Sequence, residues 1–197
     1  LLVLIPSLIF SLSFHEFAHA FAAYKLGDMT AKNQGRLTLN PLAHLDPIGG
    51  LMVLMVGFGW AKPVPVDLRQ LKNPNTAMMK VAFAGPLSNL ILALLGGLVV
   101  QASQNILLST VFLLFTQINV ALALFNLLPF PPLDGSQILS GFLVRYNPEL
   151  VYKLQMHGPK VLLGLILIGA VTKFSPIWWL IGSSVKALTM FFIGKSL

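Results

Sequence analysis

The chain has 197 residues, of which 56% are hydrophobic and only 10% are charged. An ordinary soluble domain carries about 25% charged residues, so the composition excludes a disordered protein, a coiled coil and a conventional water-soluble enzyme. We attribute the net charge of +7 to cytoplasmic loops rich in lysine and arginine rather than to nucleic-acid binding. The absence of cysteine excludes disulfides, thiolate metal ligands and a cysteine nucleophile. The sequence therefore predicts an integral membrane protein.

Apolar runs long enough to cross a membrane, which takes about 20 helical residues, begin at the first residue. The run 1–24 is interpreted as a transmembrane helix rather than a signal peptide, because no basic region precedes it. The run 48–60 contains several glycines and is too short to span comfortably, so it predicts a re-entrant or hairpin segment. Two strong spans follow at residues 78–101 and 106–128.

The remaining chain alternates between breaks and apolar stretches. A proline-rich break at residues 129–135 precedes a short predicted helix at 136–144, and the stretch 145–160 is polar. The apolar stretches 161–172 and 177–193 predict a closing helical hairpin. The fold class expected is thus an all-α polytopic membrane protein, with about five to six transmembrane helices and a re-entrant or hairpin segment after the first.

All 197 residues are interpreted as one transmembrane domain, with a core at residues 1–144 and a C-terminal helical hairpin at 160–194. Lysine and arginine are concentrated at residues 25–80 and 145–160, and residues 102–105 carry none. Because basic loops remain in the cytoplasm, we expect the first two regions to be cytoplasmic and the third to lie outside.

Two acidic residues stand in apolar surroundings, where a charge at a helix centre costs about 2.5–3.5 kcal/mol and therefore indicates a function. One of them belongs to the motif His15-Glu16-Phe17-Ala18-His19. His15 and His19 are four residues apart, so both imidazoles project from one helix face and can bind one zinc ion. Glu16 can then polarise a water molecule at the metal. Two interfacial histidines beside a snorkelling carboxylate are the structural alternative.

A tetrahedral zinc ion needs a third protein ligand. Without cysteine the candidates are His44, His157 and the acidic residues. Asp134 is the best of them, because the proline-rich break before it can unwind the helix end and aim a carboxylate inward. Gly135 permits a close backbone approach there. Asp134 can also cap the following helix, and the two roles are compatible.

Three motifs, in this order and in this membrane context, resemble the site-2 protease family of intramembrane zinc metalloproteases. They are the histidine motif, Gly85-Pro86-Leu87-Ser88-Asn89, and the pair Asn126-Leu127-Leu128-Pro129 and Leu133-Asp134-Gly135. The resemblance implies one Zn²⁺ ion held by His15, His19 and Asp134, with Glu16 as the general base. The chain has no room for the PDZ or CBS domain that this family often carries, so we expect a compact catalytic core.

Three further polar residues are candidates for binding substrate or the developing oxyanion. Asn89 suits either that role or an interhelical hydrogen bond. Asn126 lies one heptad after Asn119, and a structural hydrogen bond near the break is the simpler role for both. His44 lies in a loop and is expected to be a satisfied or supporting histidine rather than a ligand.

These observations predict a zinc metalloendopeptidase that hydrolyses a peptide bond in or near a transmembrane segment of a membrane protein. The substrate must unwind first, and the extended, proline-containing segment 57–67 offers it a strand edge. A membrane metal carrier and a catalytically inactive membrane-binding relative are the alternatives.

The expected partners are a transmembrane or membrane-anchored protein substrate and the lipid bilayer. An oligomer is compatible with the sequence, and no nucleic acid is expected. The expected location is a prokaryotic inner (plasma) membrane, crossed several times, with the active site towards the cytoplasm.

Overall fold

The computed structural model describes residues 2–56, 59, 61–172 and 174–195. In chain order the helices are α1 (Leu4–Lys25), α2 (Thr30–Asn33), α3 (Pro41–His44), α4 (Pro47–Val56), the 3₁₀ helix η1 (Leu68–Gln70), α5 (Pro74–Ala102), α6 (Ile106–Asn126), α7 (Asp134–Leu143), α8 (Pro148–Thr172) and α9 (Pro176–Phe192). Within these described ranges there is no β-strand, only an isolated antiparallel bridge between Leu45 and Ala61. The predicted all-α class is confirmed.

Three of the described helices, α5, α6 and α8, are long and apolar enough to cross a membrane. They confirm a polytopic membrane protein, although the prediction was five to six spans. Helix α1, with 22 residues, is long enough to cross a membrane but is not among these three helices. It carries the polar side chains of the two histidines and the glutamate of the motif. Helix α9 has only 17 residues, somewhat short of the roughly 20 that a bilayer core requires.

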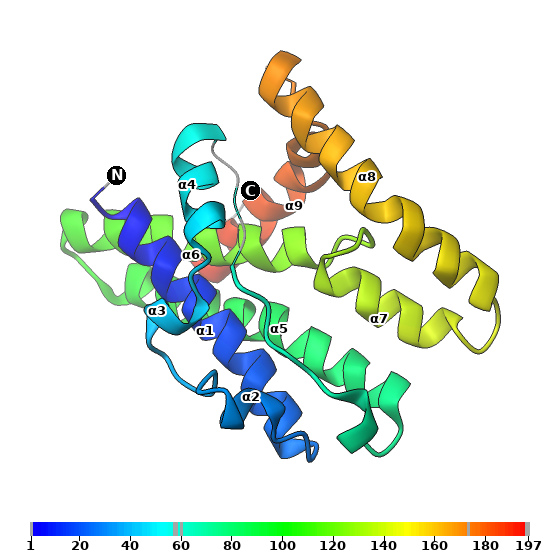
Figure 1. Ribbon diagram of the computed structural model, residues 1–197. Coiled ribbons are helices and arrows are strands. Elements are labelled where there is room, and N and C mark those ends of the chain that lie inside the picture. The colour runs from blue at the N-terminus through cyan, green and yellow to red at the C-terminus, as the bar shows by residue number, and fades with distance from the viewer. Residues whose placement is uncertain (1, 57–58, 60, 173, 196–197) are drawn as a thin grey trace.

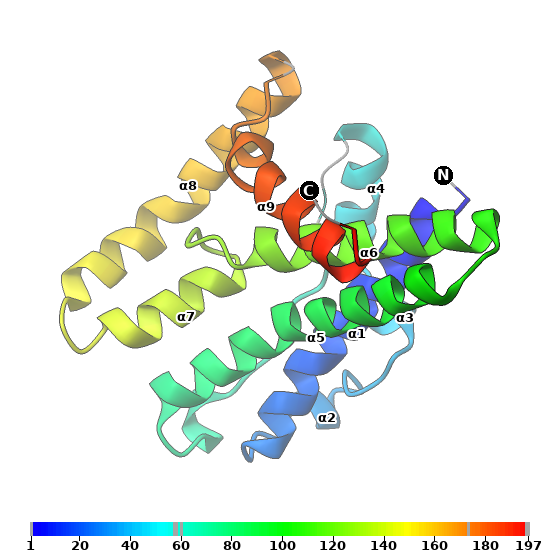
Figure 2. The same ribbon diagram turned by 180° about the vertical axis from the view of Figure 1, so that it is seen from behind.

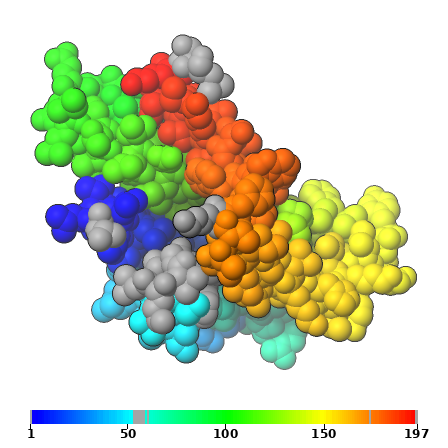
Figure 3. Space-filling view, turned by 90° about the horizontal axis from the view of Figure 1, so that it is seen from above, coloured from blue at the N-terminus to red at the C-terminus, as the bar shows by residue number. Residues whose placement is uncertain are grey.

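Helix α5 lies at the centre of the fold, with α6, α1 and α7 packed against it (Figures 1 and 2). The buried apolar core lies where α5, α6, α8 and α9 meet the turn after α6, and consists of Ala93, Val120, Leu128, Leu133, Leu162, Ile181 and Val185. The space-filling view shows α9 against α6, while α8 projects on a different side from the α5–α6 connection (Figure 3). The metal-site motifs are therefore carried by helices that contact one another.

Helix α1 buries polar side chains and exposes apolar ones. Its buried residues are Ser11, Ser13, His15, His19, Ala20 and Ala23, whereas Phe10 and Phe21 are exposed. This is the reverse of a helix on a soluble protein. In lipid, apolar side chains face outward at no cost, and polar side chains face the interior, where they find partners. The polar face of α1 is directed at α5.

The C-terminal part of the chain differs from the prediction. Residues 145–160 were expected to form a polar connection, but α8 begins at Pro148 and runs unbroken to Thr172. Proline suits the first helical position, where its missing N–H has no partner to lose. Asn147 accepts the N–H of Leu150 at 2.9 Å. The polar residues therefore belong to an exposed first half of a helix, and α9 packs more extensively on α6 than on α8.

The connection between α1 and α5 contains α2, α3, α4 and η1, joined by an extended stretch that we call the 61–67 segment. The expected re-entrant or hairpin run at 48–60 is a short helix, α4, over its first nine residues, and residues 57, 58 and 60 lie outside the described part. The segment ends at Asp67, whose carboxylate accepts the Nε–H of Arg69 at 2.9 Å. This hydrogen bond holds the pKa of Asp67 well below its usual range.

Candidate metal centre

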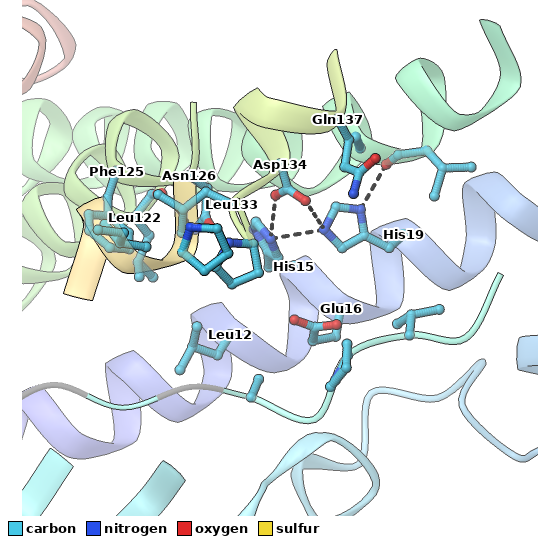
Figure 4. Close-up of a pocket in the computed structure, with 18 of the residues that line it drawn as sticks. Leu12, His15, Glu16, His19, Leu122, Phe125, Asn126, Leu133, Asp134 and Gln137 are labelled. Atoms are coloured by element: carbon cyan, nitrogen blue, oxygen red, sulfur yellow. Dashed lines mark hydrogen bonds and ion pairs between the residues drawn. The ribbon is translucent and has the colours of Figure 1, made fainter. Parts of the chain in front are cut away.

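His15, His19 and Asp134 converge from two helices that are far apart in the sequence (Figure 4). His15 Nε2 lies 3.1 Å from Asp134 Oδ2, and His19 Nε2 lies 3.3 Å from Asp134 Oδ1. The two Nε2 atoms are 3.0 Å apart. One ligand atom from each residue falls within 4.8 Å of the others, and both histidines are buried. The structure thus brings together the three residues that the sequence proposes as ligands.

The partners on the far side of each imidazole fix which nitrogen carries the proton. His19 Nδ1 lies 2.7 Å from the carbonyl oxygen of Val81, so it must donate. His15 Nδ1 lies 2.6 Å from Asn89 Oδ1. The Asn89 amide nitrogen is directed at Asn119 Oδ1, 3.0 Å away, so the Asn89 oxygen faces the ring and His15 Nδ1 also donates. Each neutral ring therefore presents an Nε2 lone pair to the centre.

These groups fit one zinc ion. Two imidazole lone pairs and a carboxylate repel one another unless a cation lies among them. Asp134 Oδ2 is buried and accepts no hydrogen bond in the described structure, so it has a lone pair available. Two histidines and a carboxylate are a known zinc ligand set of catalytic sites, which leave one position open. The hydrogen bonds from Nδ1 to a carbonyl and an amide are the outer contacts that orient such ligands.

Two glycines make room for the centre. A Cβ atom on Gly85 of α5 would lie 2.5 Å from His19 Cε1 and 2.6 Å from His15 Cε1. A Cβ on Gly135 would lie 2.5 Å from the carbonyl oxygen of Leu128, in the turn after α6. Gly85 therefore lets α5 approach both rings, and Gly135 lets the start of α7 approach α6, which places Asp134 over α1.

Glu16 lines a cavity of about 680 Å³ beside the three ligands. Its carboxylate is half-buried and makes no hydrogen bond or ion pair within the described residues. The cavity walls come from α1, α5, α6, α7, α8 and the 61–67 segment, and they include Leu12, Val81, Leu122, Phe125, Asn126, Leu133, Gln137 and Leu162. Most of these side chains are apolar, so a charged group in the cavity is poorly shielded from the metal centre.

The 61–67 segment runs along this cavity on the side of Glu16, as the pale cyan coil in Figure 4 shows. Ala61, Pro63, Val64 and Val66 line the cavity. Among the hydrogen bonds of the described residues, none involves the N–H of Val64 or Val66, and prolines have no N–H to donate. The strand edge predicted for residues 57–67 is thus extended at 61–67, while residues 57, 58 and 60 lie outside the described part.

The other three candidate residues occupy different places. Asn126 lines the cavity, but its amide nitrogen donates to the carbonyl of Leu122 in its own helix at 3.0 Å. Asn89 is fully buried behind His15. His44 is buried outside the residues that line the cavity, and its Nε2 donates to the carbonyl oxygen of Thr38 at 2.7 Å.

Sequence reasoning did not identify Gly85 and Val81 as supports of the centre, and it predicted a structural hydrogen bond for Asn119 but not its partner, Asn89. A signal was available for Gly85, which lies four residues before Asn89 and therefore on the same helix face. Asn119 is a buried amide in an apolar helix, which indicates a partner without naming it. The role of Val81 rests on its backbone carbonyl, and no side-chain pattern reveals it.

Comparison with known proteins identifies relatives. A family model described as peptidase family M50 matches residues 97–167. YwhC of Bacillus subtilis (strain 168) is 50% identical over 146 residues, which cover 69% of this chain and 67% of the relative. Rip2 of Mycolicibacterium smegmatis is 34% identical over 192 residues, covering 90% of this chain and 72% of the relative. Rip2 of Mycobacterium tuberculosis (strain H37Rv) is 31% identical over 185 residues, covering 86% and 69%.

All three relatives are named as candidate zinc metalloproteases. No solved structure matches the chain significantly. Because the relatives align with most of this chain and with two thirds or more of their own length, this integral membrane protein belongs to peptidase family M50, the site-2 protease family that its motifs resemble.

Proposed function

We propose that the chain is an intramembrane zinc endopeptidase, which hydrolyses a peptide bond in or near a transmembrane segment of a membrane-protein substrate. The observation that carries the proposal is the convergence of His15, His19 and Asp134 beside the carboxylate of Glu16, which makes no hydrogen bond or ion pair with the described residues. A structural histidine pair needs no such carboxylate, whereas peptide hydrolysis needs a base next to the metal.

Zinc, when bound, supplies a Lewis acid that polarises the scissile carbonyl and acidifies water. The two Nε2 atoms and the Asp134 carboxylate would hold it, and the hydrogen bonds of Asn89 and Val81 keep both rings in the tautomer that presents Nε2. Glu16 accepts a proton from the attacking water. It then delivers that proton to the nitrogen of the leaving amine, so the carboxylate is restored at the end of the reaction.

The substrate has to present an exposed peptide bond. A transmembrane helix satisfies its amides internally, so the bond is accessible only where the helix has unwound. The 61–67 segment supports this step, because its extended backbone lines the cavity on the Glu16 side and Val64 and Val66 leave their N–H groups unpaired in the described structure. We place the unwound substrate alongside this segment, as an added strand.

The distribution of basic residues supports an orientation in the membrane. The basic residues between α1 and α5 and those around the start of α8 favour the cytoplasmic side, and the α5–α6 connection carries no charge. Helices α1 and α5 both reach this basic side. The proposed site is therefore open to the cytoplasmic half of a prokaryotic plasma membrane, where water has access.

Purified wild-type protein and the Glu16→Gln variant, reconstituted in lipid with a transmembrane reporter, test the proposal. We expect both to contain zinc and only the wild type to cleave, with chelation abolishing cleavage. A metal carrier would instead move zinc across the vesicle without cleaving, and the described part of the chain offers it one three-ligand cluster rather than a series. Cleavage by the Glu16→Gln variant at the wild-type rate would contradict the assigned base.

A further inference from the structure

Among the residues that the structure describes, three buried ionisable side chains lie outside the metal centre and take no part in the chemistry proposed above. Asp28, Arg36 and His44 are 0%, 5% and 1% exposed. Burying a charged group is costly unless hydrogen bonds compensate it. All three belong to the connection that follows α1. The side chains of Arg36 and Asp28 hydrogen-bond to the two ends of the 61–67 segment, whereas the His44 ring contacts Arg36 and its backbone oxygen accepts from Lys62.

At the first end, both backbone polar groups of Lys62 are hydrogen-bonded. The N–H of Lys62 donates to the backbone oxygen of His44 at 2.8 Å, and its carbonyl accepts from Arg36 Nη2 at 2.5 Å. His44 Nε2 donates to the Thr38 carbonyl, which leaves Nδ1 as an acceptor 3.5 Å from the same Arg36 nitrogen. His44 thus orients the guanidinium towards Lys62.

Burying Arg36 costs free energy of folding. Its Nε is buried and has no hydrogen-bond partner in the described structure, and an unsatisfied buried donor costs about 1–3 kcal/mol. A charged donor to a carbonyl forms a stronger hydrogen bond than a neutral one. Fixing the carbonyl group of Lys62 gives a reason for burying this arginine that stability alone does not.

At the other end, the carboxylate of Asp28 binds the backbone of the segment. Asp28 Oδ2 accepts the backbone N–H of Asp67 at 2.8 Å, and Asp28 Oδ1 accepts that of Thr30 at 2.8 Å. Asp28 lies three residues after α1, the helix that carries Glu16 and both histidine ligands. The far end of the segment is therefore tied to the same helix as the proposed base.

The middle of the segment has no such anchors. No described hydrogen bond involves the backbone of residues 63–66, and Pro63 and Pro65 favour an extended chain without donating. The segment is thus fixed at Lys62 and Asp67 and open between them, where Pro63, Val64 and Val66 line the cavity.

We infer that Asp28, Arg36 and His44 are positioning residues that hold the 61–67 segment at a fixed height along α1, so that an unwound substrate pairs with Val64 and Val66 in one register relative to Glu16. The inference rests on the proposed function. It gives one reason for burying all three side chains, which is to position the segment. It also assigns His44 a role in substrate positioning rather than in metal binding.

Disulfide cross-linking tests the register without cleavage. The chain contains no cysteine, so Val64→Cys in the Glu16→Gln background provides a single reactive position. We use a set of reporter substrates, each with one cysteine at a successive position of the unwound stretch. The reporter that forms the disulfide identifies the substrate residue that lies beside the segment. We expect one dominant position when Asp28, Arg36 and His44 are intact.

Arg36→Met and Asp28→Asn loosen opposite ends of the segment, and Arg145→Met, at an exposed arginine after α7, is the matched control. We expect each loosened variant to spread cross-linking over several substrate positions while zinc content stays at one ion per chain. In the active background, kcat/KM should fall by about tenfold or more, with a fall in kcat, because the substrate is misplaced relative to Glu16 while the centre is intact. The control should behave as the parent protein does.

A single dominant position in both loosened variants would overturn the inference, and so would loss of zinc in both, because that would indicate a purely structural role. Failure of Val64→Cys to cross-link with any reporter would also overturn it. If the wild type does not cleave the reporter but the parent variant still cross-links at one dominant position, only the proposed activity is contradicted. Cleavage by the wild type with an unchanged register in the variants would contradict this inference alone.

Discussion

Gly85→Ala is the substitution whose effect on the metal centre follows most directly from the geometry. The added Cβ would lie 2.5 Å from His19 Cε1 and 2.6 Å from His15 Cε1. Ordinary van der Waals contact begins at 3.4 Å, so a ring has to move by about 0.9 Å, the difference between 3.4 and 2.5 Å. Both rings are also held on their far side by Asn89 and Val81, which limits how they can yield.

A zinc site tolerates deviations of about 0.2 Å in its bond lengths, so a shift several times larger should weaken binding. Changes to the groups that orient zinc ligands cost about 10–100-fold in affinity, and we expect a loss of that size, or about 1.4–2.7 kcal/mol. The assay is zinc competition with a chromophoric chelator on detergent-purified protein. Thermal unfolding of the zinc-free protein reports separately on packing, where overfilling costs about 1–3 kcal/mol.

Gly164→Ala is the matched control, because nothing lies within 4 Å of a Cβ placed at that position of α8. It should bind zinc as tightly as the wild type, and exchanging a helical glycine for alanine should not destabilise the protein. Wild-type zinc affinity in Gly85→Ala would show that the rings do not pack against this glycine, and it would refute the reasoning.

Other changes separate the ligands from their supports. Asp134→Asn removes the only negative charge among the three proposed ligands and should lower zinc affinity by about tenfold or more; full zinc occupancy at limiting metal would argue against a ligand role. Asn119→Leu removes the acceptor that orients the Asn89 amide and should weaken zinc binding by a smaller factor than Asp134→Asn, and equal or greater weakening would contradict this order. Deletion of Lys62–Val66 should abolish cleavage of the reporter while zinc content is unchanged, and normal cleavage would exclude a substrate-binding role for the segment.

The composition and the motif spacing were sufficient to predict the class of fold and the residues that converge. His15 and His19 share a face because they are four residues apart, and the isolated acidic residue at 134 could be paired with them through its apolar surroundings. The sequence predicted a short helix at 136–144 that Asp134 could cap; α7 begins two residues earlier, at Asp134 itself, and its N-cap is Leu133. These predictions therefore rest on local patterns in the sequence.

Features that depend on tertiary contacts were not predictable in the same way. The start of α8 was missed because polar residues on an exposed helical turn have the composition of a loop. The interaction of Val81 with His19 joins a backbone atom to a residue 62 positions away, and the sequence contains no signal for it. In the sequence, Asp28 and Arg36 resemble ordinary charged loop residues. Only their hydrogen bonds to the 61–67 segment in the structure distinguish them.

The most direct test of the central claim is zinc K-edge X-ray absorption on the purified wild-type protein together with its zinc stoichiometry. We predict one zinc ion per chain, with two imidazole nitrogens and one carboxylate oxygen at about 2.0–2.2 Å, and loss of the carboxylate signal in Asp134→Asn. A protein that binds no zinc, or a spectrum that is identical with and without the Asp134 carboxylate, would contradict the claim that these three residues form a metal centre.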